Sequence, residues 1–380
     1  MILLSGPNIS GNEWKYVKEC LDTAWVSSAG SYVSKFEEMV ADFSGAKYGV
    51  ATVNGTAALH ISLQLSGVER DDLVILPNIT FVASANAVKY IGAQPIFIDI
   101  DEFTWQMDLD ILENYLSSNT ELKDGDCFEL KSGNRIKAIM PVHVLGNMCD
   151  MERLLEIAAT YHLEIVEDST EALGSYFKNK HAGSFGKFGC FSFNGNKIIS
   201  TGGGGMIVTD DEALAKKAKH LTTQAKVDSL RYYHDEIGYN YRLVNVLAAI
   251  GVAQMEQLPG FIKRKKEIDA IYRTAFEGLA DIRFQEVNEH VDPNCWLFTF
   301  RTEYQKSLLN LLNERKLQSR PFWLPMNQLP MYRDNLYIND EDISGKVVGS
   351  CLSIPCSTYL TDQDVELVVN TVREGIFVDA

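Results

Sequence analysis

Short apolar runs alternate with helical segments through the first half of the chain. The apolar runs occupy residues 48–53, 73–76, 95–98, 137–142 and 163–166. Between them, residues 56–65, 80–90 and 151–162 have the length and apolar spacing of crossover helices. This alternation predicts an α/β fold with a mainly parallel sheet covered by helices on both faces.

Helical periodicity also predicts two helices ahead of the first strand. The first follows Ser10, whose spacing to Glu13 matches a capping box, and the second is expected to end at Gly45. Farther along, the polar composition of residues 117–135 predicts an excursion over the surface.

The last third of the chain mixes helices with short strands. A helical segment over 244–258 meets Pro259 and Gly260, which are expected to end it. Further helices are predicted over 261–276, over 305–316 and from Thr361, with short strands near Ile282 and over 296–301. We therefore predict a large domain of residues 1–258 and a smaller C-terminal α+β domain of residues 259–380.

Composition narrows the class of protein. The 380 residues are 46% hydrophobic and 23% charged, as in a globular protein, and 51 acidic against 35 basic residues give a net charge of −16. That charge opposes binding to nucleic acid or to an anionic membrane. Seven scattered cysteines, never spaced Cys-x2-Cys, indicate neither a disulfide framework nor a metal site, and they favour the cytoplasm. The sequence shows neither a signal-peptide pattern nor an 18-residue apolar stretch. We therefore expect neither secretion nor membrane insertion.

Candidate chemistry starts with Lys197. It lies between an apolar strand over 188–193 and the glycine run 202–205, which leads into a returning strand over 206–209. A lysine in such a loop is usually just solvated, so its neighbours must decide whether it has a chemical role.

Two other stretches place suggestive groups at strand ends. At Gly55 a strand runs into a helix that begins with small residues, and the free amides of such a helix start bind phosphate; an ordinary strand-to-helix turn is the alternative. The apolar strand over 163–166 delivers Asp168 to the sheet edge, where it could instead cap the next helix.

Together these groups are the three fixed points of a pyridoxal phosphate site. Lys197 supplies an amine for the aldehyde, as a Schiff base, and then a group that moves a proton; Asp168 keeps the pyridine nitrogen protonated. Ser192 could donate a hydroxyl to the phosphate. Phe81 could stack on the ring, although a core role fits it equally well.

At this point the chain resembles the DegT/DnrJ/StrS sugar aminotransferases, which have the type I fold of the aspartate aminotransferase superfamily. The resemblance spans nearly the whole chain. It is carried by the motifs at 25–30, 54–59, 77–81, 166–168, 191–197, 201–206, 238–242 and 320–321.

The resemblance implies roles for individual residues. Lys197 matches the Schiff-base lysine, Asp168 the partner of the pyridine nitrogen and Phe81 the stacking aromatic. Asn240 matches an asparagine that reaches the cofactor phosphate of the neighbouring subunit, which implies a homodimer with two shared sites. The phosphate ligands correspond to Gly55, Thr56, Ala57 and Ser192.

Three positions depart from the family pattern. Glu171 replaces the usual Gln or His three residues after the pyridine aspartate, where it would contact the cofactor. The run 201–205 has Gly203 where the family has Glu, and Asn327 stands where a His is common.

Within the family, the runs 222–226 and 234–240 are most similar to enzymes that aminate C4 of UDP-4-keto-6-deoxy-N-acetylhexosamines for surface glycans, with L-glutamate as donor. GDP-perosamine synthases are close, and other nucleotide-sugar or cyclitol aminotransferases stay open. The dehydratase branch is disfavoured because it has His in place of Lys197. A non-catalytic regulatory homologue is the alternative of another class. An NAD-binding dehydrogenase is a third possibility, but no Gly-x-Gly-x-x-Gly motif follows a strand in this sequence. The substrate and its nucleotide are expected to contact Trp25, Ser27, Tyr32, Arg231, Tyr233, Arg320, Trp323 and Asn327. For the aromatic residues of this set, packing at a subunit interface is the alternative.

Overall fold

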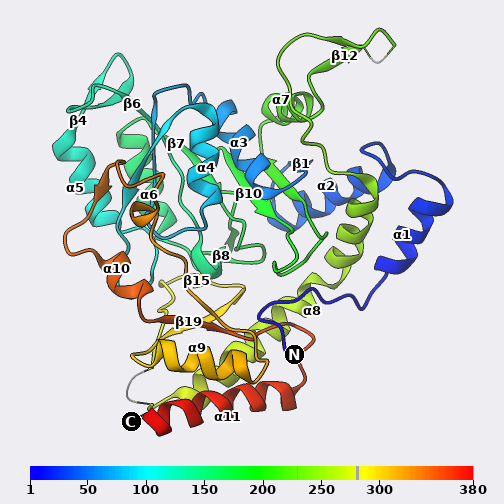
Figure 1. Cartoon of the computed structure of the whole chain (residues 1–380). Helices are drawn as coiled ribbons and strands as arrows, with labels where there is room; N and C mark the ends of the chain where they lie inside the picture. Colours follow the sequence, from blue (N-terminus) through cyan, green and yellow to red (C-terminus); the bar gives the residue numbers. More distant parts are fainter. Residues whose placement is uncertain (229, 280–281, 380) are drawn as a thin grey trace.

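A computed structural model describes residues 1–228, 230–279 and 282–379. Its centre is a sheet in which β11 alone, along the main path, runs against its neighbours β1 and β10. The predicted mainly parallel sheet is therefore confirmed (Figure 1). In spatial order its strands are β1 (Tyr48–Thr52), β11 (Gly205–Thr209), β10 (Phe188–Ser192), β7 (Glu164–Asp168), β6 (Arg135–Ile139), β2 (Leu73–Pro77), β3 (Gln94–Ile98) and β18 (Tyr337–Ile338).

Helices cover both faces of this sheet. Successive side chains of a strand point to opposite sides, so each face of the sheet has apolar positions on which helices pack. In β2, Val74 and Leu76 pack in one cluster with the first set of helices, whereas Leu73 and Ile75 pack in another with part of the second set. The first set is α3 (Gly55–Leu65), α4 (Ala83–Ile91) and α7 (Glu212–Thr222). The second set is α2 (Ser31–Ser44), α5 (Leu109–Asn119), α6 (Met151–Thr160) and α8 (Asn245–Phe276).

The C-terminal part forms a smaller antiparallel sheet, in the order β14 (Arg283–Phe284), β16 (Phe298–Arg301), β19 (Cys351–Ile354) and β17 (Arg320–Pro321). The helices α9 (Gln305–Glu314) and α11 (Asp362–Asp379) share a hydrophobic core with it and with the second half of α8. Figure 1 shows this part beneath the large sheet. The helix α10 (Ile343–Val348) precedes β19, and α1 (Glu13–Asp22) packs on α8.

The helix predicted to end at Pro259 continues without a break. α8 runs from Asn245 to Phe276 with Pro259 inside it. Proline removes the hydrogen bond to the carbonyl of Met255, but Pro259 lies on the exposed side of the helix, where water can bind that carbonyl. The two predicted helices are therefore one; the division of the chain into domains at residue 258 stays a prediction.

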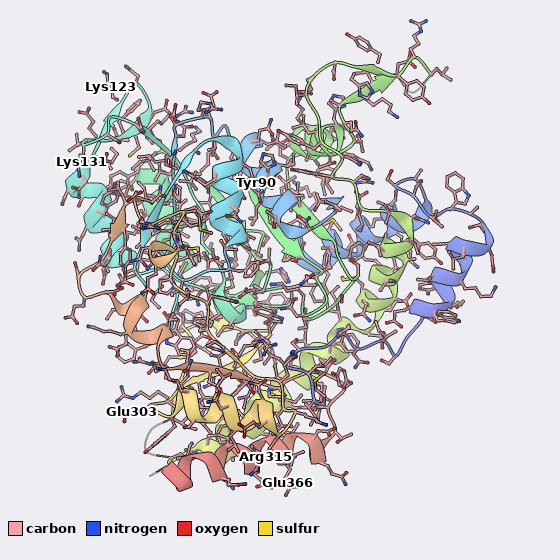
Figure 2. The ribbon with its side chains drawn as sticks, in the orientation of Figure 1. Tyr90, Lys123, Lys131, Glu303, Arg315 and Glu366 are labelled. Atoms are coloured by element: carbon pink, nitrogen blue, oxygen red, sulfur yellow. The ribbon has the colours of Figure 1, made fainter. Side chains whose placement is uncertain are left out.

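A hairpin occupies a region that the sequence predicted as a surface excursion. The expected excursion over 117–135 contains β4 (Thr120–Lys123) and β5 (Asp126–Glu129), which extend the large sheet beside β6. Figure 2 shows Lys123 on this hairpin and Lys131 in the turn that follows it. A second hairpin, β12 (Lys226–Asp228) with β13 (Tyr233–His234), projects from the molecule above α7 (Figure 1).

Small elements complete the fold. Three short strands, β8 (Tyr176–Phe177), β9 (Lys180–His181) and β15 (Val291–Asp292), form a separate sheet, and short 3-10 turns lie at Val144–Gly146 and Met326–Gln328. Among the helices in the described ranges, none combines the length and the apolar character that a membrane span requires.

Candidate active site

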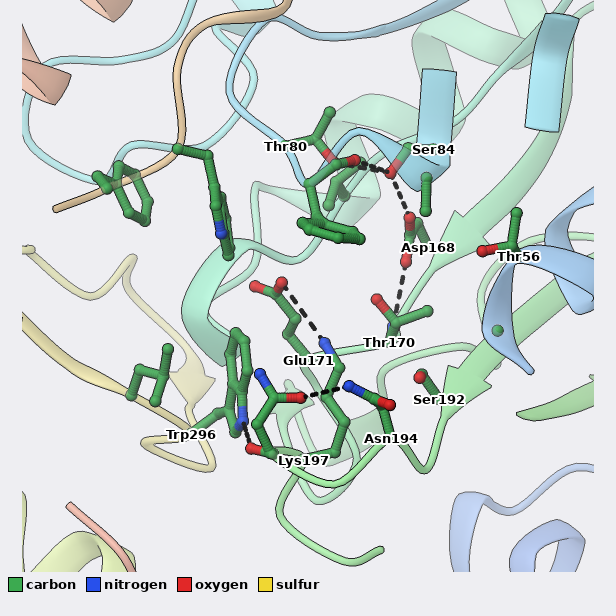
Figure 3. Close-up of a pocket in the computed structure, with 18 of the residues that line it drawn as sticks. Thr56, Thr80, Ser84, Asp168, Thr170, Glu171, Ser192, Asn194, Lys197 and Trp296 are labelled. Carbon is green, nitrogen blue, oxygen red and sulfur yellow. Dashed lines mark hydrogen bonds and ion pairs between the residues drawn. The ribbon is translucent and has the colours of Figure 1, made fainter. Parts of the chain in front are cut away.

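A cavity of about 440 Å³ lies where the carboxyl ends of β1, β2, β7 and β10 meet the smaller sheet (Figure 3). The large sheet contributes Asp168, Ser192 and the start of α3, and the turn after β10 contributes Lys197. The C-terminal part closes the cavity with Trp296, Leu297, Arg320, Pro321, Phe322, Trp323 and Ser353. Residues predicted from three separate strand ends thus meet in one place, as expected for an open α/β sheet.

Asp168 is held rigidly at the end of β7. Its backbone N–H donates to the carbonyl of Pro141 (2.9 Å), and its own carbonyl accepts from the N–H of His143 (3.1 Å). Its carboxylate accepts from the hydroxyl of Ser84 (2.6 Å) and the N–H of Thr170 (3.2 Å). A buried carboxylate with these donors keeps one orientation toward the cavity.

The start of α3 forms the anion-binding wall. The side chain of Asn54 caps the helix by accepting the N–H of Ala57 (2.8 Å). The amides of Gly55 and Thr56 have no intrahelical acceptor and line the cavity beside Ser192. A Cβ atom at Gly55 would lie 2.9 Å from the Cβ of Ser192, so only glycine leaves this wall open. Ala57, expected as a phosphate ligand, is buried, and its amide N–H already donates to the side chain of Asn54.

The glycine run after Lys197 has two different uses. A Cβ atom at Gly205 would lie 2.5 Å from the backbone of Asn54, so this glycine allows β11 to approach the start of α3. At Gly203, where the family has Glu, a Cβ atom would meet only the carbonyl of Val53 at 4.0 Å. The departure from the family pattern therefore lies at a position with open space.

Lys197 reaches the cavity from a tight turn in which its N–H donates to the carbonyl of Asn194 (3.0 Å). Its Nζ atom lies 3.7 Å from a carboxylate oxygen of Glu171 and 4.1 Å from the ring centre of Trp296. Burial lowers the pKa of the amine, and the carboxylates of Glu171 and Asp168 oppose that shift. A lysine in this environment exchanges its proton more readily than an exposed one.

Glu171 faces Lys197 from the loop after β7. Its other carboxylate oxygen accepts the N–H of Leu145 (2.8 Å), which holds Leu145 in a left-handed conformation with φ of 61°. Burial raises the pKa of Glu171 to about 7, against the opposing charge of Lys197. The residue that departs from the family pattern is thus a carboxyl group beside the amine, with a pKa that burial raises toward neutrality.

Phe81, Arg320 and Trp323 lie at the rim. Phe81 is 54% exposed and meets the ring of Trp323 edge-on at 6.4 Å, which excludes the core role that the sequence left open. Its face is therefore accessible from the cavity that it lines.

The other expected contacts lie outside this cavity. Tyr32 donates its hydroxyl to Glu19 (2.8 Å), and Asn327 exchanges hydrogen bonds with Asn78 (3.0 Å each), which holds the loop before Phe81. Asn240 lines a separate groove with Gln224 and Arg242. Of the remaining expected residues, Trp25 and Ser27 are exposed on the loop 23–30, and Arg231 and Tyr233 are exposed on the projecting hairpin that carries β12 and β13.

Ser84 and Trp296 are among the residues of the site that were not identified from the sequence. Ser84 lies one residue inside α4, and its helical position gives no sign that it reaches Asp168. Trp296 reads as part of a buried strand, although an aromatic residue whose indole N–H needs a partner was a usable signal.

The type I fold, with an amine, a carboxylate and an anion-binding helix start around one cavity, defines a pyridoxal phosphate enzyme. Comparisons with known proteins identify the family. Residues 7–373 match the DegT/DnrJ/EryC1/StrS aminotransferase family, and the chain belongs to it. It is a sugar aminotransferase that depends on pyridoxal phosphate, as predicted.

Relatives match over almost the full length. The chain is 38% identical over 371 residues to the GDP-perosamine synthase of Escherichia coli O157:H7, with 97% of this chain and 96% of that protein covered. It is 35% identical over 381 residues to the GDP-perosamine synthase of Caulobacter vibrioides, with coverage of 97% and 96%. The solved aminotransferase TlmJ of Streptoalloteichus hindustanus has a TM-score of 0.89 and 25% identity and covers 100% of this chain and 99% of its own.

Proposed function

We propose that this enzyme transfers an amino group from L-glutamate to C4 of a nucleotide-linked 4-keto-6-deoxy sugar, in the synthesis of a surface glycan. One observation carries the proposal: Lys197, Asp168 and the start of α3 line the same cavity, whose rim carries Arg320 and aromatic side chains. These groups suit an anionic, ring-containing substrate that enters over a fixed cofactor.

The cavity residues fit pyridoxal phosphate. The open wall at Gly55, the amides of α3 and the hydroxyl of Ser192 would hold the phosphate, and Asp168 would face the ring nitrogen. Phe81 would stack on the ring, and Lys197 would bind the aldehyde carbon through its amine. When bound, the cofactor accepts the amino group from the donor and passes it to the keto sugar.

Lys197 and Glu171 would handle the proton. The amine of Lys197, once free, would take the proton from the carbon that is losing nitrogen and deliver it to the carbon that is gaining nitrogen. Glu171, at 3.7 Å, neutralises the ammonium form of Lys197 while the proton is held. The regulatory alternative would be favoured by the loss of these residues, and Lys197, Asp168 and Glu171 all line the cavity.

We infer further that two copies share their sites through Asn240. In this chain Asn240 lies outside the cavity, on a groove beside the projecting hairpin β12–β13, from which it could reach a second copy. Mixing Lys197→Ala chains with Asn240→Ala chains should restore activity, because some mixed dimers would contain one intact site. Activity no greater than that of the two separate variants would contradict shared sites.

The identity of the nucleotide is the most specific part of the proposal. The motifs at 222–226 and 234–240 favour a UDP-linked N-acetylhexosamine, whereas the two perosamine synthases at 38% and 35% identity favour a GDP-linked sugar. A panel of UDP-, GDP- and dTDP-4-keto-6-deoxy sugars, each with L-glutamate and read by product mass, would decide. Reaction with GDP- or dTDP-linked sugars alone would refute the UDP assignment.

Lys197→Ala tests the chemistry itself. Its loss should lower product formation by at least about a thousandfold, since the residue both binds the cofactor and moves the proton. Borohydride treatment followed by peptide mass analysis should find the cofactor attached at Lys197 and at no other lysine. Lys187→Ala, which removes a lysine paired with Glu164 outside the cavity, is the matched control and should keep both properties. A wild-type chain that retains no cofactor after reduction would overturn the proposal.

A further inference from the structure

Trp296 contacts the lysine turn in two ways. The residue is 2% exposed, and the face of its ring lies 4.1 Å from the Nζ atom of Lys197 (Figure 3). Its indole N–H donates to the carbonyl of Asn196, the residue before Lys197, at 2.7 Å. The ring is therefore fixed to the backbone that carries the amine and lies against the amine itself.

The amine of Lys197 thus has a carboxylate near it and an aromatic face against it. Glu171 and the Trp296 face both favour the ammonium form, whereas burial favours the neutral amine. The other charged groups that line the cavity are Asp168 at the end of β7 and Arg320 on β17. Within the described part of the chain, Trp296 is the aromatic residue found in cation contact with Lys197.

Trp296 is held from behind by a buried lysine. Lys265, on α8 and 2% exposed, donates its ammonium to the carbonyl of Trp296 (2.7 Å) and lies 3.5 Å from the sulfur of Cys356. On the other side, the N–H of Trp296 donates to the side chain of Asn294 (2.9 Å), which itself donates to the carbonyl of Glu171 (2.8 Å). The segment that presents the indole is tied both to α8 and to the residue facing Lys197.

We propose that Trp296 is a catalytic residue that holds the released amine of Lys197 as an ammonium through a cation–π contact, and that Lys265 is its positioning residue. The inference rests on the proposed function, in which Lys197 alternates between a bound amine and a free one that carries the proton. The ring face stabilises the protonated form of the free amine. The C-terminal part of the chain therefore takes part in proton transfer as well as in closing the cavity.

The test measures the proton affinity of Lys197 in the full-length chain before cofactor is added. Acetic anhydride acylates only neutral amines, so peptide mass analysis of labelling at Lys197 across a pH series gives the midpoint of its titration. Trp296→Leu should lower that midpoint by about one pH unit, and Trp296→Phe, with a weaker ring face, by less.

The sign of the shift decides between two roles. If Trp296 only keeps water away, its replacement by leucine admits water, and the midpoint rises or stays where it is; either result overturns the proposal. Trp105→Leu is the matched control, because Trp105 is also buried and donates its indole N–H to a backbone carbonyl (Glu102, 3.1 Å). Its midpoint should match that of the wild type even though a buried indole is lost.

Lys265→Met tests the positioning role. It should shift the midpoint in the same direction as Trp296→Leu but by less, whereas an unchanged midpoint would remove Lys265 from the proposal. In the holoenzyme, the basic limb of the pH profile of kcat should move to lower pH in the Trp296→Leu variant. Labelling needs no substrate, so a chain that shows the shift but forms no product would refute the proposed function and leave the contact standing.

Discussion

Two buried glutamates four residues apart, Glu167 and Glu171, have opposite surroundings. Glu167 accepts from the backbone N–H groups of Gly183 (2.7 Å), Phe185 (2.6 Å) and Gly186 (2.7 Å) and lies 3.0 Å from the ring nitrogen of His143. Glu171 has one backbone donor, Leu145, and a lysine amine at 3.7 Å. Glu167 is fully buried outside the cavity, whereas Glu171 lines the cavity.

The difference shows how the fold assigns a role to a buried carboxylate. Surrounded by donors, Glu167 ties the end of β7 to the loop 181–186, which supports the backbone of Asp168. With fewer donors, Glu171 has its pKa raised by burial to about 7, where a small change in surroundings moves a proton. One carboxylate maintains the site and the other is available to react in it.

A Glu→Gln substitution at each position should distinguish the two roles, and the larger effect on stability is expected at Glu167. In Glu167→Gln, an amide NH2 replaces an acceptor and must face at least one backbone N–H, so a buried donor loses its partner. We expect a loss of about 2–4 kcal/mol in the free energy of unfolding, measured by urea denaturation at pH 7.5. A loss below about 1 kcal/mol would show that the donors around Glu167 do not matter for stability.

At Glu171 the same change should act through pH. Because the folded-state pKa of about 7 lies above the ordinary 4.5, the unfolded wild type gives up its proton first, and folding becomes less favourable as pH rises from 4.5 to 7. Glu171→Gln removes that loss. Relative to the wild type, it should gain up to about 3 kcal/mol across this interval and nothing more above it. Urea denaturation at pH 4.5, 5.5, 6.5 and 7.5 would measure the gain, and a stability difference that does not change with pH would mean that burial does not perturb Glu171.

Glu164→Gln supplies the baseline for both experiments. Glu164 begins the same strand and pairs with Lys187 at 3.0 Å, but both side chains are about a third exposed. Water already solvates such a pair, so the expected change is below about 1 kcal/mol and independent of pH near neutrality. A larger effect would mean that the strand itself, rather than burial of the carboxylate, sets the response.

Several parts of the site were predictable because they are local. The strand ends at Gly55, Asp168 and Ser192 could be predicted from runs of apolar residues, and parallel strands bring such ends to one edge of a sheet. Lys197 follows one of these ends within a turn, so its place in the cavity also came from nearby sequence. The family resemblance added their roles.

Other parts depended on which side of an element meets solvent. Proline was expected to end a helix, but α8 continues because Pro259 lies on its exposed side. The residues 117–135 looked like a surface loop because their composition is polar, but hairpin pairing at a sheet edge satisfies the backbone regardless of composition. Neither outcome can be found from a pattern of apolar positions alone.

By itself, the sequence determined the sheet, the strand ends and the three groups that a pyridoxal phosphate site needs, because each depends on residues close together in the chain. Only the tertiary structure decided that Trp296 lies against Lys197, that Ser84 holds Asp168, and that Glu167 and Glu171 differ in their donors. Those contacts join residues from 84 to 99 positions apart or depend on backbone groups brought in from other loops. Proton affinity in the interior follows from such neighbours, so it is a property of the packed molecule.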